Sequence, residues 1–225
     1  MKPLIIAIDG PSGAGKGTLA RAVADALRYR HVDTGAMYRA VAWKAVRDHL
    51  PLDDDAALSR LAESAAIDQR DGRIAIDGHD VTREIRTPEM DRAAASVARI
   101  PGVRSALVAR QRALGAERGV VMEGRDIGTV VFPEADVKVY LDASAEERAR
   151  RRASDAAHTG GQQANLAGVQ SDLQARDRSD STRAVAPLAM AADATYIDTT
   201  GMAIGEVVAR VMELVRQRLG ERSTN

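Results

Sequence analysis

A glycine-rich segment near the N-terminus has the residue types and spacing of a phosphate-binding loop. It reads Gly10-Pro11-Ser12-Gly13-Ala14-Gly15-Lys16-Gly17-Thr18 and lies between an apolar run at 4–8 and a helical pattern at 19–27. Glycines let backbone N–H groups approach phosphate oxygens, and the N-terminus of the following helix favours an anion. We therefore predict that this segment binds a nucleoside triphosphate, with Lys16 at the β and γ phosphates.

The loop departs from the strict pattern GxxxxGK[ST], because Gly17 stands where a hydroxyl would contact magnesium. Thr18 follows one place later. We expect Mg²⁺ to accompany ATP and to be held mainly by phosphates and water, with Thr18 as a candidate ligand. The ending GKGT resembles nucleoside monophosphate kinases more than GTPases. The two asparagines, Asn165 and Asn225, are not in an NKxD context, which excludes a GTPase.

Basic residues recur at helical spacing in the C-terminal half. They are Arg148 and Arg152 on one predicted helix, followed by Arg176 and Arg183 near the next, with Asp180 between these last two. Guanidiniums that flank the donor phosphates would stabilise the charge that shifts during phosphoryl transfer, and with Lys16 they are the candidate catalytic residues. The alternative is solvated helix surface with local ion pairs, for example to Glu147 or Asp177.

Apolar runs alternate with helical patterns, which predicts a three-layer α/β fold with a parallel central sheet and ligands at the carboxyl ends of its strands. The predicted strands are 3–8, 119–122, 137–141 and 195–197. The predicted helices run to about Arg28, from a polar turn at 32–35 to about Asp48, and over 103–117, 144–154, 166–179 and 203–219. This pattern predicts a single P-loop domain spanning 1–225.

Two segments interrupt this rhythm. Residues 66–81 read as short strands with turns at Asp71-Gly72 and Asp77-Gly78, and a helix at 87–99 follows, so we predict a small β insertion over about 64–99. It would be a mobile flap on the acceptor side or a surface decoration of the fold. The glycines at 160–161, between two arginine-bearing helices, indicate a short lid over about 154–166.

Composition limits the function further. The formal net charge is zero and the pI is about 6.9, which disfavours polynucleotides and anionic membranes as partners. Cysteine is absent, the four histidines lack metal-ligand spacing, and no segment approaches the roughly 18 apolar residues of a membrane span. We expect a cytoplasmic protein that binds small molecules and is a monomer.

Five motifs occur in an order that resembles the bacterial cytidylate kinase family of nucleoside monophosphate kinases. They are GPSGAGKGT, DTGAMYR, IRTPEMD, EGRDIGTVVFP and RDRSDSTRAVAPL, and the likeness spans about residues 4–219. The resemblance implies transfer of a phosphoryl group from ATP to CMP or dCMP. It also likens the insertion at 66–81 to the three-stranded extension on the CMP-binding side of bacterial members.

The resemblance also assigns acceptor residues. It implies that Arg39 and Arg125 bind the CMP phosphate, that Asp180 contacts the sugar, and that Arg176 and Arg183 reach the transferring group. Cytosine carries an amino donor and two acceptors, and a matching set is Asp126 and Thr34 opposite the amine and Arg104 opposite the ring. In an alternative interpretation, Glu123 is the magnesium acid and Asp126 forms a turn.

Two departures from the family pattern bear on these assignments. Thr34 replaces a common serine and keeps its hydroxyl, whereas Ser179 and Ser181 replace common arginines and would leave the acceptor site less positive. The competing functions are a kinase for another small acceptor, such as UMP, AMP or shikimate, and a regulatory P-loop protein without turnover. An assay of ADP formation with separate acceptors would distinguish them.

Overall fold

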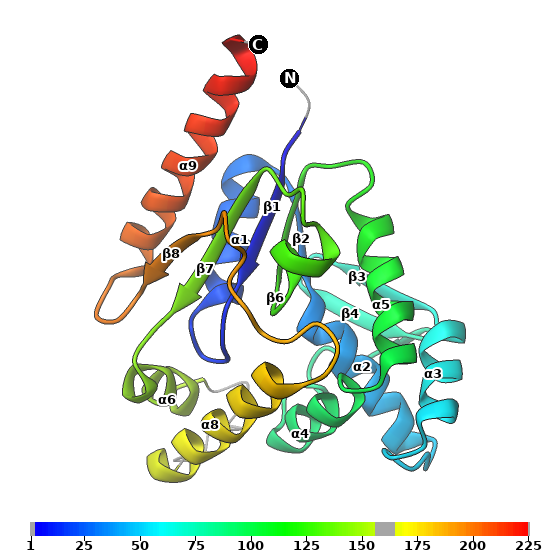
Figure 1. Cartoon of the computed structure of the whole chain (residues 1–225). Helices are drawn as coiled ribbons and strands as arrows, with labels where there is room; N and C mark the ends of the chain where they lie inside the picture. Colours follow the sequence, from blue (N-terminus) through cyan, green and yellow to red (C-terminus); the bar gives the residue numbers. More distant parts are fainter. Residues whose placement is uncertain (1–2, 156–164, 225) are drawn as a thin grey trace.

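A parallel five-stranded sheet organises the chain. The computed structural model describes residues 3–155 and 165–224. The strands are β1 (Ile5–Asp9), β2 (Arg30–Asp33), β6 (Val120–Gly124), β7 (Val137–Asp142) and β8 (Thr195–Asp198), in the spatial order β2-β6-β1-β7-β8 (Figure 1). Every neighbouring pair is parallel, so the carboxyl ends meet at one edge. This confirms the predicted α/β fold.

Helices cover both faces of this sheet. They are α1 (Lys16–Leu27) and α9 (Ile204–Thr224) on one face, and α2 (Thr34–Arg47) and α5 (Pro101–Leu114) on the other. Ile6 and Ile8 of β1 are buried with α1 and α9, while Ile5 and Ala7 are buried with α2 and α5. This alternation is what a strand covered on both sides requires. In the described part of the chain, none of the helices is long and apolar enough to cross a membrane.

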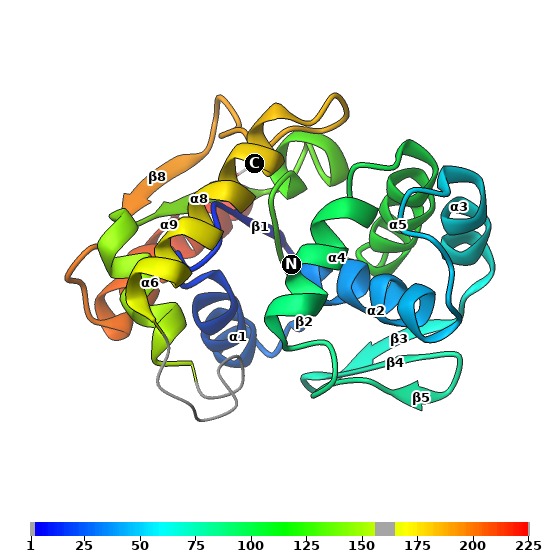
Figure 2. The ribbon, with the colours of Figure 1, turned by 90° about the horizontal axis from the view of Figure 1, so that it is seen from below.

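Residues 55–97 form an arm at one side of the sheet, which we call the insertion arm. It contains α3 (Asp55–Ser64), β3 (Ile67–Arg70), β4 (Arg73–Ile76), β5 (His79–Asp80) and α4 (Pro88–Val97). The three strands form an antiparallel sheet, as the two Asp-Gly turns predicted (Figure 2). Ile74 and Ile76 are buried in the core cluster that also contains α2, so this small sheet is packed against the main domain.

Two helices on the other side complete the architecture. They are α6 (Ala145–Ala153) and α8 (Leu166–Thr182), and a short π-helical turn, η1 (Ile127–Val131), follows β6. Figure 1 shows α6, α8 and α4 beyond the carboxyl ends of the strands. The tip of the predicted lid, including the glycines at 160–161, lies outside the described residues.

Two elements differ from the sequence-based expectation. The edge strand β2 is Arg30–Asp33, part of which was predicted as a turn. It pairs with β6 on one side, and its polar residues do not show the apolar pattern of a buried strand. Asp33 does begin the next helix, because its side chain accepts a hydrogen bond from Ala36 N. The helix α3 was not predicted, although Asp54 caps it by accepting from Ala57 N.

Candidate functional site

The loop between β1 and α1 turns so tightly that glycine is required. Gly10 has φ +146°, and an added Cβ would lie 2.0 Å from the backbone oxygen of Leu141. Gly13 has φ +81° and lies against Arg148 of α6, which would be 3.0 Å from its Cβ. Residues with a side chain rarely adopt these φ angles. Because glycine has no Cβ, the backbone N–H groups of the loop can also approach a ligand closely. The loop therefore has the tight backbone shape that a phosphate-binding segment requires, and phosphate binding by it stays a prediction.

Lys16 begins α1 and is buried beside this loop. Its Nζ donates to the Pro11 carbonyl oxygen at 2.7 Å, which holds the ammonium over the loop. Burial lowers the pKa of Lys16 to about 7, with a further contribution from the positive charge of Arg125. An anion bound here would reverse this effect, because it stabilises the charged form.

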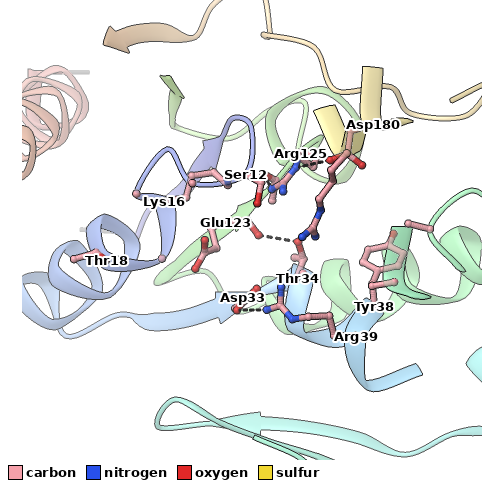
Figure 3. Close-up of a pocket in the computed structure, with 18 of the residues that line it drawn as sticks. Ser12, Lys16, Thr18, Asp33, Thr34, Tyr38, Arg39, Glu123, Arg125 and Asp180 are labelled. Carbon is pink, nitrogen blue, oxygen red and sulfur yellow. Dashed lines mark hydrogen bonds and ion pairs between the residues drawn. The ribbon is translucent and has the colours of Figure 1, made fainter. Parts of the chain in front are cut away.

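A cavity of about 710 Å³ extends from this loop to the insertion arm (Figure 3). Most predicted site residues line it: Ser12, Gly13, Gly15, Lys16, Gly17, Thr18, Thr34, Arg39, Arg104, Arg125, Asp126, Arg152, Arg176, Asp180 and Arg183. Gly10, Pro11, Ala14 and Arg148 are not part of its wall. Basic side chains outnumber acidic ones along the wall, so the cavity favours anions.

The start of α2 contributes one side of this cavity. Asp33 caps the helix, and its second oxygen accepts from Arg39 Nη2 at 3.0 Å. Although burial opposes the change, the Arg39 guanidinium lowers the pKa of Asp33 below its usual value. Thr34 Oγ1 donates to the Glu123 carbonyl oxygen at 2.7 Å, which leaves the lone pairs of the hydroxyl for a donor on a ligand.

Asp126 lies between two arginines deep in the cavity. Its carboxylate binds Arg104, and Oδ1 is 3.8 Å from Arg183 Nη2. All three side chains are at most 8% exposed, and the Arg104 guanidinium lies 5.5 Å from the centre of the Tyr38 ring. The carboxylate oxygens of Asp126 are hydrogen-bond acceptors, and the two guanidiniums orient them in the cavity.

Asp180 of α8 contacts two further arginines. Its Oδ2 accepts from Arg125 Nε at 2.9 Å (Figure 3). Its Oδ1 is 3.7 Å from Arg183 Nη1. Burial opposes ionisation here, but the charges of Arg125 and Arg176 lower the pKa of Asp180. The end of β6 and the end of α8 are thereby joined across the cavity wall.

Glu123, at the end of β6, lies near the N-terminus of α1. Its Oε1 is 3.0 Å from His31 Nε2 and would be 3.1 Å from a Cβ at Gly17. The carboxylate therefore occupies the neighbourhood of the hydroxyl that Gly17 lacks. It is an oxygen donor suited to a hard cation or its water shell.

Comparison with known proteins decides the family. The family model for cytidylate kinase matches residues 6–217. The chain belongs to the cytidylate kinase family. The cytidylate kinase of Solibacter usitatus is 48% identical over 222 residues, covering 97% of this chain and 94% of that protein. The cytidylate kinase of Desulforamulus reducens is 51% identical over 215 residues, covering 94% and 96%. The family resemblance drawn from the five motifs is confirmed.

Solved structures agree on the fold of this cytidylate kinase family member. A gluconokinase from Sinorhizobium meliloti aligns with a TM-score of 0.53 at 16% identity, covering 100% of this chain and 98% of its own. A shikimate kinase from Bacteroides thetaiotaomicron aligns with a TM-score of 0.51 at 15% identity, covering 95% and 98%. At this identity the likeness shows a shared fold only, and the acceptor substrate has to be argued from the residues of the site.

Arg148 lies beneath the phosphate-binding loop rather than in the cavity. Its guanidinium donates to the backbone oxygens of Ser12 and Ala143 at 3.1 Å and pairs with Asp177. The sequence-based alternative was solvated helix surface with local ion pairs; the pair with Asp177 is present, but Arg148 is buried rather than solvated. Arg148 is kept out of the cavity because Gly13 packs directly against the backbone of α6 at this residue.

Arg151 and Asp9 are among the residues of the site that were not identified from the sequence. Arg151 lines the cavity, lies 3.6 Å from a Cβ position on Gly15, and donates to the Thr199 oxygens. Asp9 accepts from the backbone N–H groups of Ile127 and Gly128 at 2.8 and 2.7 Å, and burial raises its pKa to about 6. Asp9 thereby fixes the turn that carries Asp126. The Arg148 to Arg151 helical spacing was a usable signal, whereas Asp9 gave none.

Proposed function

We propose that this protein transfers the γ-phosphoryl group of ATP to CMP, forming ADP and CDP, and that dCMP is also an acceptor. The supporting observation is the continuity of the cavity. One space is bounded at one end by the phosphate-binding loop and at the other by Asp126 with its two arginines. Two nucleotides can therefore lie phosphate to phosphate, with guanidiniums around the junction. Family membership supports cytosine as the acceptor base.

At the donor end, the backbone of residues 10–15 and the Lys16 ammonium would bind the triphosphate. Mg²⁺ fits this end, because Glu123 presents a carboxylate beside Gly17 and Thr18 lines the same wall. Magnesium prefers oxygen ligands and usually keeps several waters together with substrate phosphates. We propose that Glu123 and Thr18 hold it through water or directly. When bound, the ion neutralises charge on the donor phosphates.

Binding of ATP should draw a proton onto Lys16. The pKa of Lys16 is about 7 in the ligand-free chain, so at about pH 8.5 the amine is mostly neutral, and anionic phosphates would recharge it. At about pH 6 it is already charged and the uptake should vanish. Calorimetry in two buffers of different ionisation enthalpy measures this uptake. Equal uptake by wild type and Lys16→Met at pH 8.5 would show that another group takes the proton.

At the acceptor end, the Asp126 carboxylate and the Thr34 hydroxyl would accept from the cytosine amine, and Arg104 would donate to the ring acceptors. Uracil presents a carbonyl at the position of the amine. A carbonyl facing the Asp126 carboxylate in a buried site costs about 1 to 3 kcal/mol. We propose that this repulsion selects cytosine.

The remaining acceptor groups would bind phosphate and sugar. Arg39 and Arg125 lie on the cavity wall near α2 and β6, where they would hold the CMP phosphate. Asp180 would accept from sugar hydroxyls while keeping Arg125 in place. A carboxylate can accept a hydrogen bond from one sugar hydroxyl or from two. We therefore include dCMP, which lacks the 2′-hydroxyl, as an acceptor.

The transfer itself would rely on positioning and charge. The CMP phosphate oxygen is ionised near neutral pH, so no general base is needed for its in-line attack on the γ phosphorus. A bond forms between the CMP phosphate oxygen and the γ phosphorus as the bond between the γ phosphorus and the ADP oxygen breaks. Lys16, Arg152, Arg176 and Arg183 would stabilise the charge spread over this group, while Arg148 supports the loop backbone from below. We expect the protein to be a monomer, so that all of these residues come from one chain.

The test is ADP formation from ATP with CMP, dCMP, UMP and AMP supplied separately. We expect CMP and dCMP to stimulate ADP release strongly, UMP to do so about 5- to 150-fold less efficiently, and AMP least. Preference for UMP or AMP would contradict the cytosine assignment. Stimulation by none of the four would favour a regulatory P-loop protein.

A further inference from the structure

Asp91, in the first turns of α4, lies where three arginines that line the cavity meet. Its Oδ1 is 2.9 Å from Arg176 Nη1 and 3.8 Å from Arg39 Nη1, and its Oδ2 contacts Arg152. These arginines belong to α8, α2 and α6, and each lines the cavity. One carboxylate of the insertion arm therefore gathers guanidiniums from both sides of the proposed junction between the two nucleotides.

These guanidiniums retain capacity for a further anion. Within the described part of the chain, the buried Nε atoms of Arg39 and Arg176 have no hydrogen-bond partner. Asp91 is near all three cations, although Arg39 also pairs with Asp33 and Arg152 lies 3.9 Å from Asp155. Burial lowers the pKa of Arg176, which indicates incomplete compensation of its charge. A buried donor without a hydrogen-bond partner costs free energy, so an additional acceptor that binds beside these arginines would be stabilised.

We propose that Asp91 is an internal stand-in for phosphate, which holds these three arginines in the ligand-free protein and must release them when nucleotide phosphates bind. A carboxylate and a phosphate accept from a guanidinium in the same way, but a phosphate carries more charge and more oxygens. Asp91 is 14% exposed and lies in the first turns of its helix, so release of the arginines requires its side chain to rotate away from them towards the solvent. The inference rests on the proposed function for the identity of the phosphates.

The contact with Asp91 should weaken phosphate binding. Arginines engaged by Asp91 are not free for a ligand, and apparent affinity falls by the fraction of molecules in which they are engaged. A carboxylate left beside bound phosphates would also repel them. Removing the charge at residue 91 should therefore strengthen the binding of phosphate-bearing ligands and leave the nucleoside unaffected.

The experiment compares wild type, Asp91→Asn and Glu89→Gln by titration calorimetry at low salt. Glu89 is an exposed acid in the same helical turn, so its variant removes the same charge without touching the arginines. The probes are CMP, cytidine and inorganic tripolyphosphate. For Asp91→Asn we expect about five- to tenfold tighter binding of CMP and tripolyphosphate, unchanged cytidine binding, and a smaller gain at high salt. Glu89→Gln should match wild type.

Weaker or unchanged binding of CMP and tripolyphosphate by a folded Asp91→Asn would overturn the proposal, since it would mean that Asp91 orients the arginines for the ligand. An equal gain in Glu89→Gln would also overturn it, because bulk charge would then explain the effect. If wild type does not bind CMP, the proposed function fails instead. The tripolyphosphate titration then decides the role of Asp91 independently.

Discussion

Replacing Lys16 with methionine should lower kcat/KM by several kcal/mol, which corresponds to about 10³-fold or more, with the fold intact. Methionine keeps the apolar stem but removes the only positive charge that the first turn of α1 offers to the phosphates. The ammonium already lies over the loop, held by the Pro11 carbonyl oxygen. Little reorganisation is therefore needed before it can stabilise the transferring group. Steady-state kinetics with saturating Mg²⁺ measure the loss.

The matched control is Lys44→Met. Lys44 lies on α2, pairs with Asp48 and is absent from the cavity wall, so its loss should change kcat/KM by less than about threefold. A Lys16→Met enzyme that retains nearly native kcat/KM would remove Lys16 from the proposed mechanism. Circular dichroism on both variants separates loss of catalysis from loss of folding.

Replacing Asp126 with asparagine should reduce the preference for CMP over UMP by about 5- to 150-fold in kcat/KM. Asparagine has nearly the same shape but can turn its amide to donate to the uracil carbonyl, which the carboxylate cannot do. The measurement is the ratio of kcat/KM for the two acceptors. An unchanged ratio would assign base selection to Thr34, Arg104 or another group.

The same substitution should also destabilise the protein by about 3 to 5 kcal/mol, because Arg104 and Arg183 are left buried without their shared counter-charge. Asp136→Asn is the control for this effect. Asp136 is a similarly buried carboxylate that pairs with Arg118 away from the cavity. It should lower the melting temperature while leaving the CMP to UMP ratio unchanged.

Local spacing predicted those features whose partners are close in the sequence. The loop at 10–18 is specified by glycines, a lysine and the helix that follows, all within one short segment. The hairpins of the insertion arm were likewise predicted by Asp71-Gly72 and Asp77-Gly78, because positive φ at these positions determines the turns. Apolar runs such as that at 119–122, most of which lies in β6, were recognised because both faces of the strand are buried.

The features that sequence reasoning missed depend on distant partners. Arg30–Asp33 is a strand only because β6 pairs with it. Asp9 and Asp91 act on residues more than 50 positions away, so no local pattern distinguishes them from ordinary surface acids. Arg148 and Arg152 share a helix face in the sequence, yet packing against Gly13 places the first below the loop and leaves the second in the cavity.

The central claim is that one cavity holds two nucleotides with their phosphates facing each other. The most direct measurement is inhibition by a bisubstrate in which cytidine and adenosine are joined 5′ to 5′ through five phosphates. The account predicts that one molecule binds per chain and that inhibition is competitive against both ATP and CMP, with affinity well above that of either substrate. Competition with ATP alone, while CMP still binds, would contradict it.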